Sequence, residues 1–296
     1  MHKSLKDRYR SCVQILAKKK TRKEFIWTLV KTLVMGAFGI VMIMPFIWMI
    51  SSSFKDSISM FRYPIEWIPK KFNFESYKDV WMRDVNFARF YLNSIKVTVI
   101  TLVGTFFSCS MAAYAYAKIK FPGRDKLFLL KLSSTMIPMQ VTMLPTFVIY
   151  KSLGLVNTHA SLWLGSFFGG AFGVFLMRQF FITIPDELSE AAKMDGCSHY
   201  RIYGEIILPL AKPALATLLF IYFTWTWNDY EKPLLYLRTP GLYTLPLALK
   251  YFADENYTNY AAIMAAAVCM SLPVIVLFLF AQKYFIEGIA STGIKG

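Results

Sequence analysis

The residues of this chain best suited to specific polar chemistry lie in one stretch, 178–212, between two long apolar segments. The stretch holds four Lys or Arg and five Asp or Glu, so its charges nearly balance. No metal-ligand set accompanies them, because His2, His159 and His199 share no helical face and no zinc-type spacing occurs in the sequence. We therefore interpret the stretch as a surface that docks onto another protein.

The start of this stretch predicts a short helix over about 185–195. Pro185 suits the first turn of a helix, and the carboxylates of Asp186 and Glu187 suit the positive end of the helix dipole. Gly196 follows, and glycine readily adopts the left-handed conformation that ends a helix. The pattern therefore indicates a stiff segment that stops at a defined turn.

One face of this predicted helix suits insertion into a groove. Leu188, Ala191 and Ala192 have i, i+3 and i+4 spacing, so small side chains would let a partner come close while leucine adds apolar area. A second helix is predicted over 198–207, with Pro209 breaking the hydrogen-bond ladder after it. A cytoplasmic loop that is simply helical, with no docking role, is an equally good reading of these residues alone.

The elements that must hold this stretch are membrane helices. Of the 296 residues, 56% are hydrophobic and 17% are charged, below the roughly 25% charged residues of soluble domains. A helix needs about 20 apolar residues to cross a hydrocarbon core of about 30 Å. The sequence predicts six such spans, the fifth of them short: 33–50, 95–117, 132–150, 160–177, 213–227 and 260–281.

Basic residues set the expected orientation. Residues 1–31 contain ten Lys or Arg against two acidic residues, so this segment should stay in the cytoplasm. Lys118, Lys120, Arg124 and Lys126 form a second basic cluster, which falls on the same side after two crossings. Six spans then place both termini in the cytoplasm, and the net charge of +15 needs no nucleic acid partner to explain it. A regulatory contact with anionic lipid is a second reading of the N-terminal cluster.

The predicted spans carry no ionisable residue at their centres, which argues against an ion-coupled secondary transporter. Gly165, Gly169 and Gly173 predict a flat strip for close helix packing. Polar side chains also occur in the spans, and they either bond between helices or line a pathway. They are Ser108, Ser110, Gln140, Thr142, Thr224, Thr226 and Asn228.

The chain shows no energy source of its own. It lacks the glycine-rich loop that cradles nucleotide phosphates, so uphill transport would need work from another polypeptide. Its four cysteines are far apart and are interpreted as free thiols: Cys12, Cys109, Cys197 and Cys269.

The order of residues in the polar stretch resembles a known signature, E-A-A-x3-G-x9-I-x-L-P. It is matched without a gap by Glu190, Ala191, Ala192, Gly196, Ile206, Leu208 and Pro209. The chain is similar to permease subunits of binding-protein-dependent ABC importers, and specifically to the smaller maltose-type permease. Further segments carry the same resemblance, including PFIWMISSSFK, FPGR, GLVNT and WNDYEKPL.

The resemblance implies a fold and a set of partners. The fold would be an all-α integral membrane protein with six transmembrane helices and a cytoplasmic helix-turn-helix coupling loop between the fourth and fifth. Glu190, Ala191, Ala192 and Gly196 would dock into a cytoplasmic ABC ATPase dimer, supported by Leu188, Ile206, Leu208 and Pro209. The implied partners are a second, homologous permease subunit and an extracytoplasmic solute-binding protein, with membrane lipid around them. ATP and Mg²⁺ would bind the ATPase, leaving this chain without a cofactor and without catalysis. The location would be a bacterial or archaeal cytoplasmic (inner) membrane.

The loop 229–259 resembles the one that reaches toward the binding protein in maltose-type permeases. On the binding-protein or substrate side we therefore expect Asn228, Tyr243, Tyr251 and Tyr257, and the resemblance implies a sugar, specifically an oligosaccharide, as the solute. The tyrosines equally suit an aromatic belt at the membrane interface.

The expected organisation has three parts: a basic segment 1–31, a permease domain 32–281 and a cytoplasmic tail 282–296. Two other functions remain open at this point. An ion-coupled secondary transporter would need no ATPase, and a non-transporting membrane scaffold would tolerate replacement of Glu190.

Overall fold

The computed structural model describes residues 22–56, 59–61, 63–82, 87–252 and 259–292, and within these ranges every regular element is helical. Side chains are described up to Lys283, except those at 22–23 and 251–252. The chain forms two compact units, Met1–Ser51 and Ser52–Gly296. The expectation of an all-α membrane protein is confirmed, since four described helices are long and apolar enough to span a bilayer, or up to six if each of two bent helix pairs counts as one span.

The first unit contains most of helix α2 (Arg22–Ser53), which begins earlier than the predicted span. Its 32 residues would extend about 48 Å, more than enough for a bilayer core. Most of its large apolar side chains are exposed, as for Met35 and Ile40, and Trp48 and Met49 near its end are half-buried. A helix that exposes apolar residues on all sides is suited to contact with lipid or other membrane helices.

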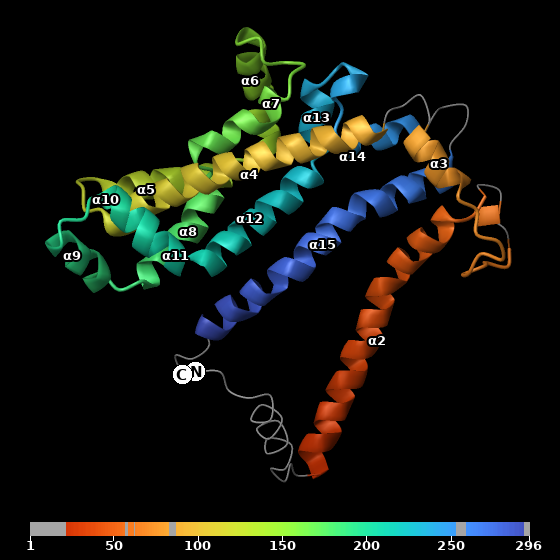
Figure 1. The fold of residues 1–296 in the computed structure, drawn as a ribbon, viewed down its shortest axis with the longest axis horizontal. Helices are drawn as coiled ribbons and strands as arrows, with labels where there is room; N and C mark the ends of the chain where they lie inside the picture. The colour runs from red at the N-terminus through yellow and green to blue at the C-terminus, as the bar shows by residue number, and fades with distance from the viewer. Residues whose placement is uncertain (1–21, 57–58, 62, 83–86, 253–258, 293–296) are drawn as a thin grey trace. The chain divides into compact units, whose positions relative to one another are not determined.

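The second unit is built around α4 (Phe87–Lys118), as Figure 1 shows. Helix α4 packs against α8 (Ala171–Thr183) and α12 (Lys212–Trp227), and α12 packs in turn against α15 (Tyr260–Thr292). This arrangement leaves two ends at which the connecting segments gather. Helices α9 (Glu187–Met194) and α10 (His199–Arg201) lie at one end, and α13 (Glu231–Tyr236) and α14 (Leu245–Ala248) lie toward the other.

The remaining elements are short or continue these helices. They are η1 (Ser59–Phe61), α3 (Glu75–Met82), α5 (Arg124–Ser133), η2 (Ser134–Met136), α6 (Met139–Ser152), α7 (Ala160–Trp163), η3 (Leu164–Phe168), η4 (Ile202–Ile207), α11 (Leu208–Leu210), η5 (Pro240–Leu242) and η6 (Leu249–Phe252).

One of the predicted spans is sharply bent, and another follows directly after a sharp bend. The predicted span 132–150 breaks at Pro138, where α5–η2 and α6 meet at 100°. The predicted span 213–227 is preceded by the segment His199–Leu210, which meets α12 at 81°. Pro138 disfavours helical backbone at the preceding residue, and Ile137 is accordingly extended. Bilayer length alone does not reveal such bends.

The prediction that Gly165, Gly169 and Gly173 form a strip along one helix is wrong. Gly169 has φ of +63° and ends η3, so Gly165 and Gly173 do not belong to one continuous helix. Close packing holds only at part of it. A Cβ on Gly173 would lie 2.7 Å from Cys109 Sγ, whereas a Cβ on Gly165 would meet nothing nearer than 3.8 Å.

The buried side chains form two clusters, one toward each end of the unit. The first joins α4, α8 and the α9–α12 segment, with Phe181, Ile202 and Ile207 fully buried. The second joins α3, α4, α12 and α15 around Phe87 and Trp227. Trp227 Nε1 donates to the carbonyl of Met270 at 2.9 Å, which satisfies a polar atom inside the second cluster.

Candidate functional site

The first candidate site is α9, whose N-terminus is anchored to the end of α4. Lys118, the last residue of α4, is 3% exposed at its side chain and forms an ion pair with Asp186 Oδ1 at 2.6 Å. The same ammonium donates to the carbonyl of Ile184 at 2.5 Å. The hydrogen bond from Lys118 holds the pKa of Asp186 below its usual value. Two bonds from one buried cation therefore fix the point at which α9 begins.

The faces of α9 differ from the prediction. Ser189 and Ala192 are buried at 6% and 7% exposure, and Ala192 belongs to the first buried cluster of its own chain. Leu188 is 43% exposed, and Glu190 and Ala191 are also exposed. Ala192 therefore does not share an accessible face with Leu188 and Ala191, because a short helix that packs on the bundle must bury one side. Its small side chain serves the close approach of α9 to this chain.

The turn after α9 is a Schellman motif. Gly196 has φ of +81°, its N–H donates to the carbonyl of Lys193 at 3.0 Å, and the N–H of Cys197 donates to that of Ala192 at 2.9 Å. A Cβ on Gly196 would meet no atom within 4 Å, so the backbone conformation alone requires glycine. The predicted stop at Gly196 is confirmed, with α9 starting at Glu187, two residues later than predicted.

The second helical piece extends farther than predicted. It starts at Ser198, whose hydroxyl accepts from the N–H of Arg201, and passes through the π-helical turn η4. It then continues through Pro209 to Leu210 and bends at Ala211. Pro209 was predicted to break the ladder, but the widened turn before it relieves the clash that a proline ring makes with the carbonyl four residues earlier. Ile206 and Leu208 are half-buried against the first cluster.

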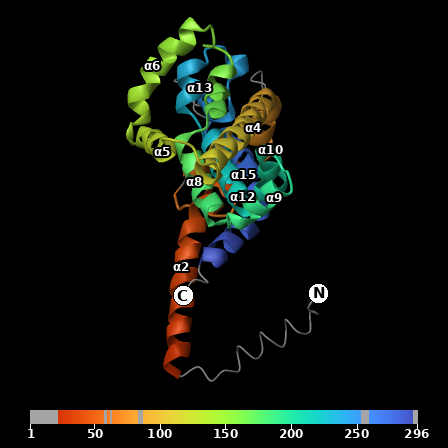
Figure 2. The same ribbon diagram turned by 90° about the vertical axis from the view of Figure 1, so that its left-hand side faces the viewer.

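Side-chain hydrogen bonds brace this piece on α4. Tyr203 and Ser110 share a hydrogen bond of 2.7 Å, and the hydroxyl of Tyr114 lies 3.2 Å from His199 Nδ1. Figure 2, which looks onto this end of the unit, shows α9 and α10 grouped together while α6 arches away from them. The helix-turn-helix is therefore a stiff attachment to the bundle, with the exposed face of α9 outermost.

At the opposite end, one asparagine organises the connection around α13. Asn157 has φ of +62°, and its side-chain oxygen accepts from the N–H groups of Arg238 and Thr239, both at 2.9 Å. Its own N–H donates to the carbonyl of Tyr236 at 2.8 Å. His159 Nε2 adds a contact of 2.8 Å with the carbonyl of Leu242. These bonds hold the loop beside a cavity.

The residues predicted for this end do not converge. Asn228 donates to the carbonyl of Thr224 within its own helix at 2.9 Å, and the hydroxyl of Tyr243 donates to the carbonyl of Arg238 at 3.3 Å. Tyr251 lies in η6 with its side chain outside the described part of the chain, and Tyr257 lies wholly outside it. Asn228 and Tyr243, whose side chains are described, each bond to a backbone carbonyl of their own segment.

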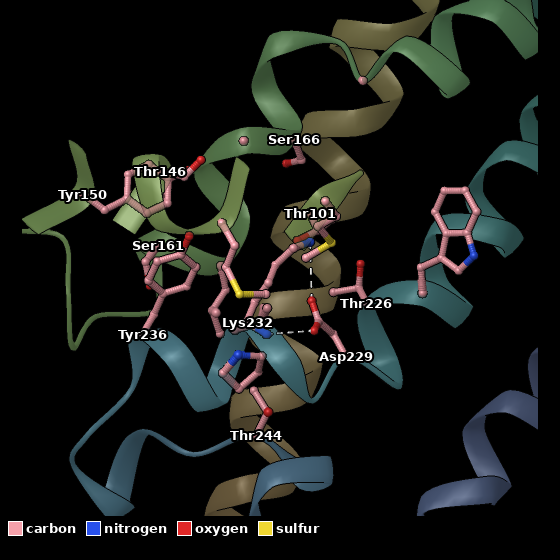
Figure 3. Close-up of a pocket in the computed structure, with 18 of the residues that line it drawn as sticks. Thr101, Thr146, Tyr150, Ser161, Ser166, Thr226, Asp229, Lys232, Tyr236 and Thr244 are labelled. Carbon is pink, nitrogen blue, oxygen red and sulfur yellow. Dashed lines mark hydrogen bonds and ion pairs between the residues drawn. The ribbon is translucent and has the colours of Figure 1, made fainter. Parts of the chain in front are cut away.

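The second candidate site is a cavity of about 400 Å³ that the sequence does not predict, lined by apolar side chains together with several hydroxyl-bearing residues. It lies between α4, α6, η3, α12 and α13, and Figure 3 shows hydroxyl groups, aromatic rings and one ion pair around it. Its hydroxyl-bearing Ser and Thr residues are Thr101, Thr142, Thr146, Ser161, Ser166, Thr226 and Thr244. For Thr142 and Thr226 the sequence allows either bonding between helices or lining of a pathway, and in the structure both residues line the cavity. The bend at Pro138 places α6 against the cavity. The sequence does not indicate the direction in which the chain bends there.

The described residues contain no cluster of three or more His, Cys, Asp or Glu side chains able to hold a metal ion. Cys109, Cys197 and Cys269 are free thiols, as predicted, and Cys12 lies outside the described residues.

Comparisons with known proteins agree on one family. Residues 104–291 match the family described as binding-protein-dependent transport system inner membrane component. The chain is 34% identical over 254 residues to the probable ABC transporter permease protein YurM of Bacillus subtilis (strain 168), covering 85% of this chain and 83% of that protein. It is 33% identical to the galactooligosaccharides transport system permease protein GanQ of the same organism, covering 95% of this chain and all of that one.

A second named relative and a solved structure extend the likeness. The arabinooligosaccharides transport system permease protein AraQ of Halalkalibacterium halodurans is 32% identical, with 94% of this chain and 100% of that protein covered. The crystal structure of a bacterial ABC transporter that imports the acidic polysaccharide alginate contains a similar chain. The TM-score is 0.80 at 27% identity, and the match covers 90% of this chain and 99% of that one.

Proposed function

This chain belongs to the family of binding-protein-dependent transport system inner membrane components, and on that premise we propose that it is one of two permease subunits of an ATP-driven sugar importer. A second, homologous permease would complete the translocation pathway with it. An extracytoplasmic solute-binding protein would deliver the solute, and a cytoplasmic ABC ATPase dimer would supply the work. The solute we propose is an oligosaccharide, because relatives that match nearly all of the chain are named for arabinooligosaccharides and galactooligosaccharides.

The observation that supports this proposal most strongly is the way in which α9 is attached to the helix bundle. Its outer face presents Leu188, Glu190 and Ala191, while its inner face is packed on the bundle and its start is bonded to Lys118. A rigid lever of this kind transmits displacement to the helices attached to it, which a flexible loop would not do. Gly196 supplies the turn that links the lever to α10 and α12.

Orientation and roles follow from this assignment. The α9 end faces the cytoplasm together with the basic segment 1–31, the tail 282–296 and both termini. The cavity end of the permease domain 32–281 faces outward, with the loop 229–259 toward the binding protein. The subunit is not catalytic, and ATP with Mg²⁺ is bound by the ATPase partner. The location is a bacterial or archaeal cytoplasmic membrane.

Replacing Glu190 tests the proposal. In vesicles that contain both permeases and the ATPase, with the binding protein outside, Glu190→Ala should lower ATP-driven uptake about 10- to 100-fold. This range follows from losing a hydrogen bond to a charged group, about 1.5–3 kcal/mol. Initial uptake and ATP hydrolysis are measured on the same preparation, and hydrolysis stimulated by the binding protein should fall with uptake.

Glu75→Ala is the matched control, because Glu75 is also an exposed carboxylate in the first turn of an eight-residue helix, and it lies outside the loop 229–259. Its uptake should equal that of the wild type. Uptake by Glu190→Ala at the wild-type rate, or ATP-independent uptake driven by a proton gradient, would refute the proposed function.

A further inference from the structure

One arginine in α8, near its junction with α9, joins three helices. The side chain of Arg178 is 14% exposed, and its Nε donates to the carbonyl of Tyr116 in the last turn of α4 at 3.2 Å. Its Nη2 forms an ion pair with Asp125 Oδ1 in the first turn of α5, also at 3.2 Å. The guanidinium carbon lies 4.1 Å from the centre of the Phe128 ring, which also belongs to α5. A single side chain therefore ties α4, α5 and α8 together.

These three contacts match the chemistry of a guanidinium group. Carbonyls in the last turn of a helix lack partners within that helix, so the carbonyl of Tyr116 is available to a side-chain donor. A guanidinium is planar, carries several N–H donors and stacks on aromatic faces. A lysine has a compact ammonium group and no planar face, so it would not make the same three contacts at once. The geometry therefore calls for arginine at position 178.

The two helices on the far side of this tie have little packing of their own. Helix α5 has one buried residue, Phe128, and α6 has none. Lys131 adds a hydrogen bond of 3.4 Å to a carbonyl of η3. Toward the other end of α6, Phe147 and Tyr150 contact the ring of Tyr236, with centroids 6.2 and 5.4 Å apart. Figure 2 shows α6 arching away from the rest of the unit between these supports. The contacts of Arg178 are therefore a large part of what holds α5 on the bundle.

Arg178 also lies between α9 and these two helices. Helix α8 leads into α9 through residues 184–186, and Lys118 bonds to the first and the last of them. Asp125 and Arg178 are 53 positions apart in the chain, so their ion pair joins the two ends of a long segment that includes α5, α6 and α7. A displacement of α9 and α8 can therefore reach α5 directly across this pair.

We propose that Arg178 is a positioning residue for coupling, which makes α5 and the base of α6 follow α8 when the ATPase displaces α9. The inference rests on the proposed function, because it needs α9 to be the driven element. It adds a second transfer of force inside the subunit, from α8 to the bent helix pair that contributes a wall of the cavity. Arg178 acts through Asp125 and Phe128, and it does not line the cavity itself.

The amount of solute taken up per ATP hydrolysed tests this role. In vesicles that contain the complete transporter, Arg178→Met should keep the ATP hydrolysis that the binding protein stimulates. Uptake per ATP should fall about three- to tenfold, the equivalent of one hydrogen bond. The KM for the loaded binding protein should not change, because the outer surface is unaltered. Arg178→Lys keeps the cation and should lie between Arg178→Met and the wild type.

A residue needed only for folding would give a different result. It would lower the amount of assembled transporter, and the remaining transporter would keep the wild-type ratio of uptake to hydrolysis. Asp125→Ala removes the other half of the pair from a side chain that is 65% exposed, so it separates the tie from a folding defect in Arg178→Met. It should also lower uptake per ATP, and the double variant should lose no more than Arg178→Met, since both changes remove the same contact.

Arg124→Met is the matched control. Arg124 binds the same carboxylate, with Nε 3.1 Å from Asp125 Oδ1, but the two are neighbours in the chain, so this pair joins no separate helices. Its uptake per ATP should equal that of the wild type. A wild-type ratio in both Arg178→Met and Asp125→Ala, an equal loss in Arg124→Met, or additive losses in the double variant would each overturn the role of Arg178. Failure of the proposed function is distinct, because the uptake of the wild type itself would then not depend on ATP.

Discussion

The two ends of the second unit differ in whether their buried polar groups have hydrogen-bond partners. At the α9 end, the buried ammonium of Lys118 makes two hydrogen bonds, and the N–H groups of Gly196 and Cys197 close the helix with two more. In the cavity, the hydroxyl groups of Thr101 and Thr244 are buried and unused. We propose that the α9 end transmits force, and a segment that does so is stiffer when its polar groups are satisfied within the chain. The degree of internal satisfaction therefore differs between the proposed coupling segment and the cavity.

The most damaging change to the α9 end should be the removal of its anchor. Lys118→Met keeps the length of the side chain but removes both bonds from the ammonium, to Asp186 and to the carbonyl of Ile184. Most of the ion-pair attraction is screened because Asp186 is 67% exposed, so the loss comes mainly from the charge-assisted hydrogen bonds, about 1.5–3 kcal/mol. The midpoint temperature for thermal unfolding of the complex should fall, and so should the amount of solute taken up per ATP hydrolysed.

Lys120→Met is the control for Lys118→Met. Lys120 is an exposed cation two residues away, and it takes part in none of the ion pairs found among the described residues. If both variants lose the same stability and the same coupling, then the general basic charge of this end matters and the anchor does not.

A smaller effect should follow from Gly196→Ala. The added Cβ meets no atom, so the cost is that of holding a left-handed backbone at φ of +81°, about 1–2 kcal/mol. Gly204→Ala is the control, because its Cβ also meets nothing and its backbone is not left-handed. Unfolding of the two variants in detergent should differ by this amount, with Gly204→Ala at least as stable as the wild type. Equal stability would show that the turn does not constrain the lever.

The smallest expected effect is the pH dependence of the anchor. The pKa of Asp186 is lowered from 3.8 by its hydrogen bond to Lys118. Because the folded-state pKa lies below the unfolded one, the stabilisation is complete above pH 3.8 and is lost as pH falls through the lowered value. The stability difference between the wild type and Lys118→Met should therefore stay constant from neutral pH to about 4 and shrink below it. A difference that shrinks already between pH 7 and 5 would assign the effect to another group.

The sequence predicted the elements whose signals are local. Apolar length located the long helices, and proline, acidic residues and glycine located α9 and its stop at Gly196. It did not predict that Ala192 packs on its own chain, because helical spacing does not say which face the bundle covers. It also missed the cavity, since Thr101, Thr146 and Thr244 come from distant segments that meet only after the bend at Pro138.

Cross-linking of α9 tests most directly whether this helix is the element that meets the ATPase. Leu188→Cys is introduced with Cys197→Ala, so that the exposed position 188 carries the accessible thiol of this end. A short reagent that reacts with the thiol at position 188 and carries a photoactivatable second group, applied to the assembled transporter, should on illumination join position 188 to the ATPase subunit, and the yield should change when ATP is added. Cross-linking to the solute-binding protein, or the absence of any product with the ATPase, would contradict the assignment of α9 as the coupling lever.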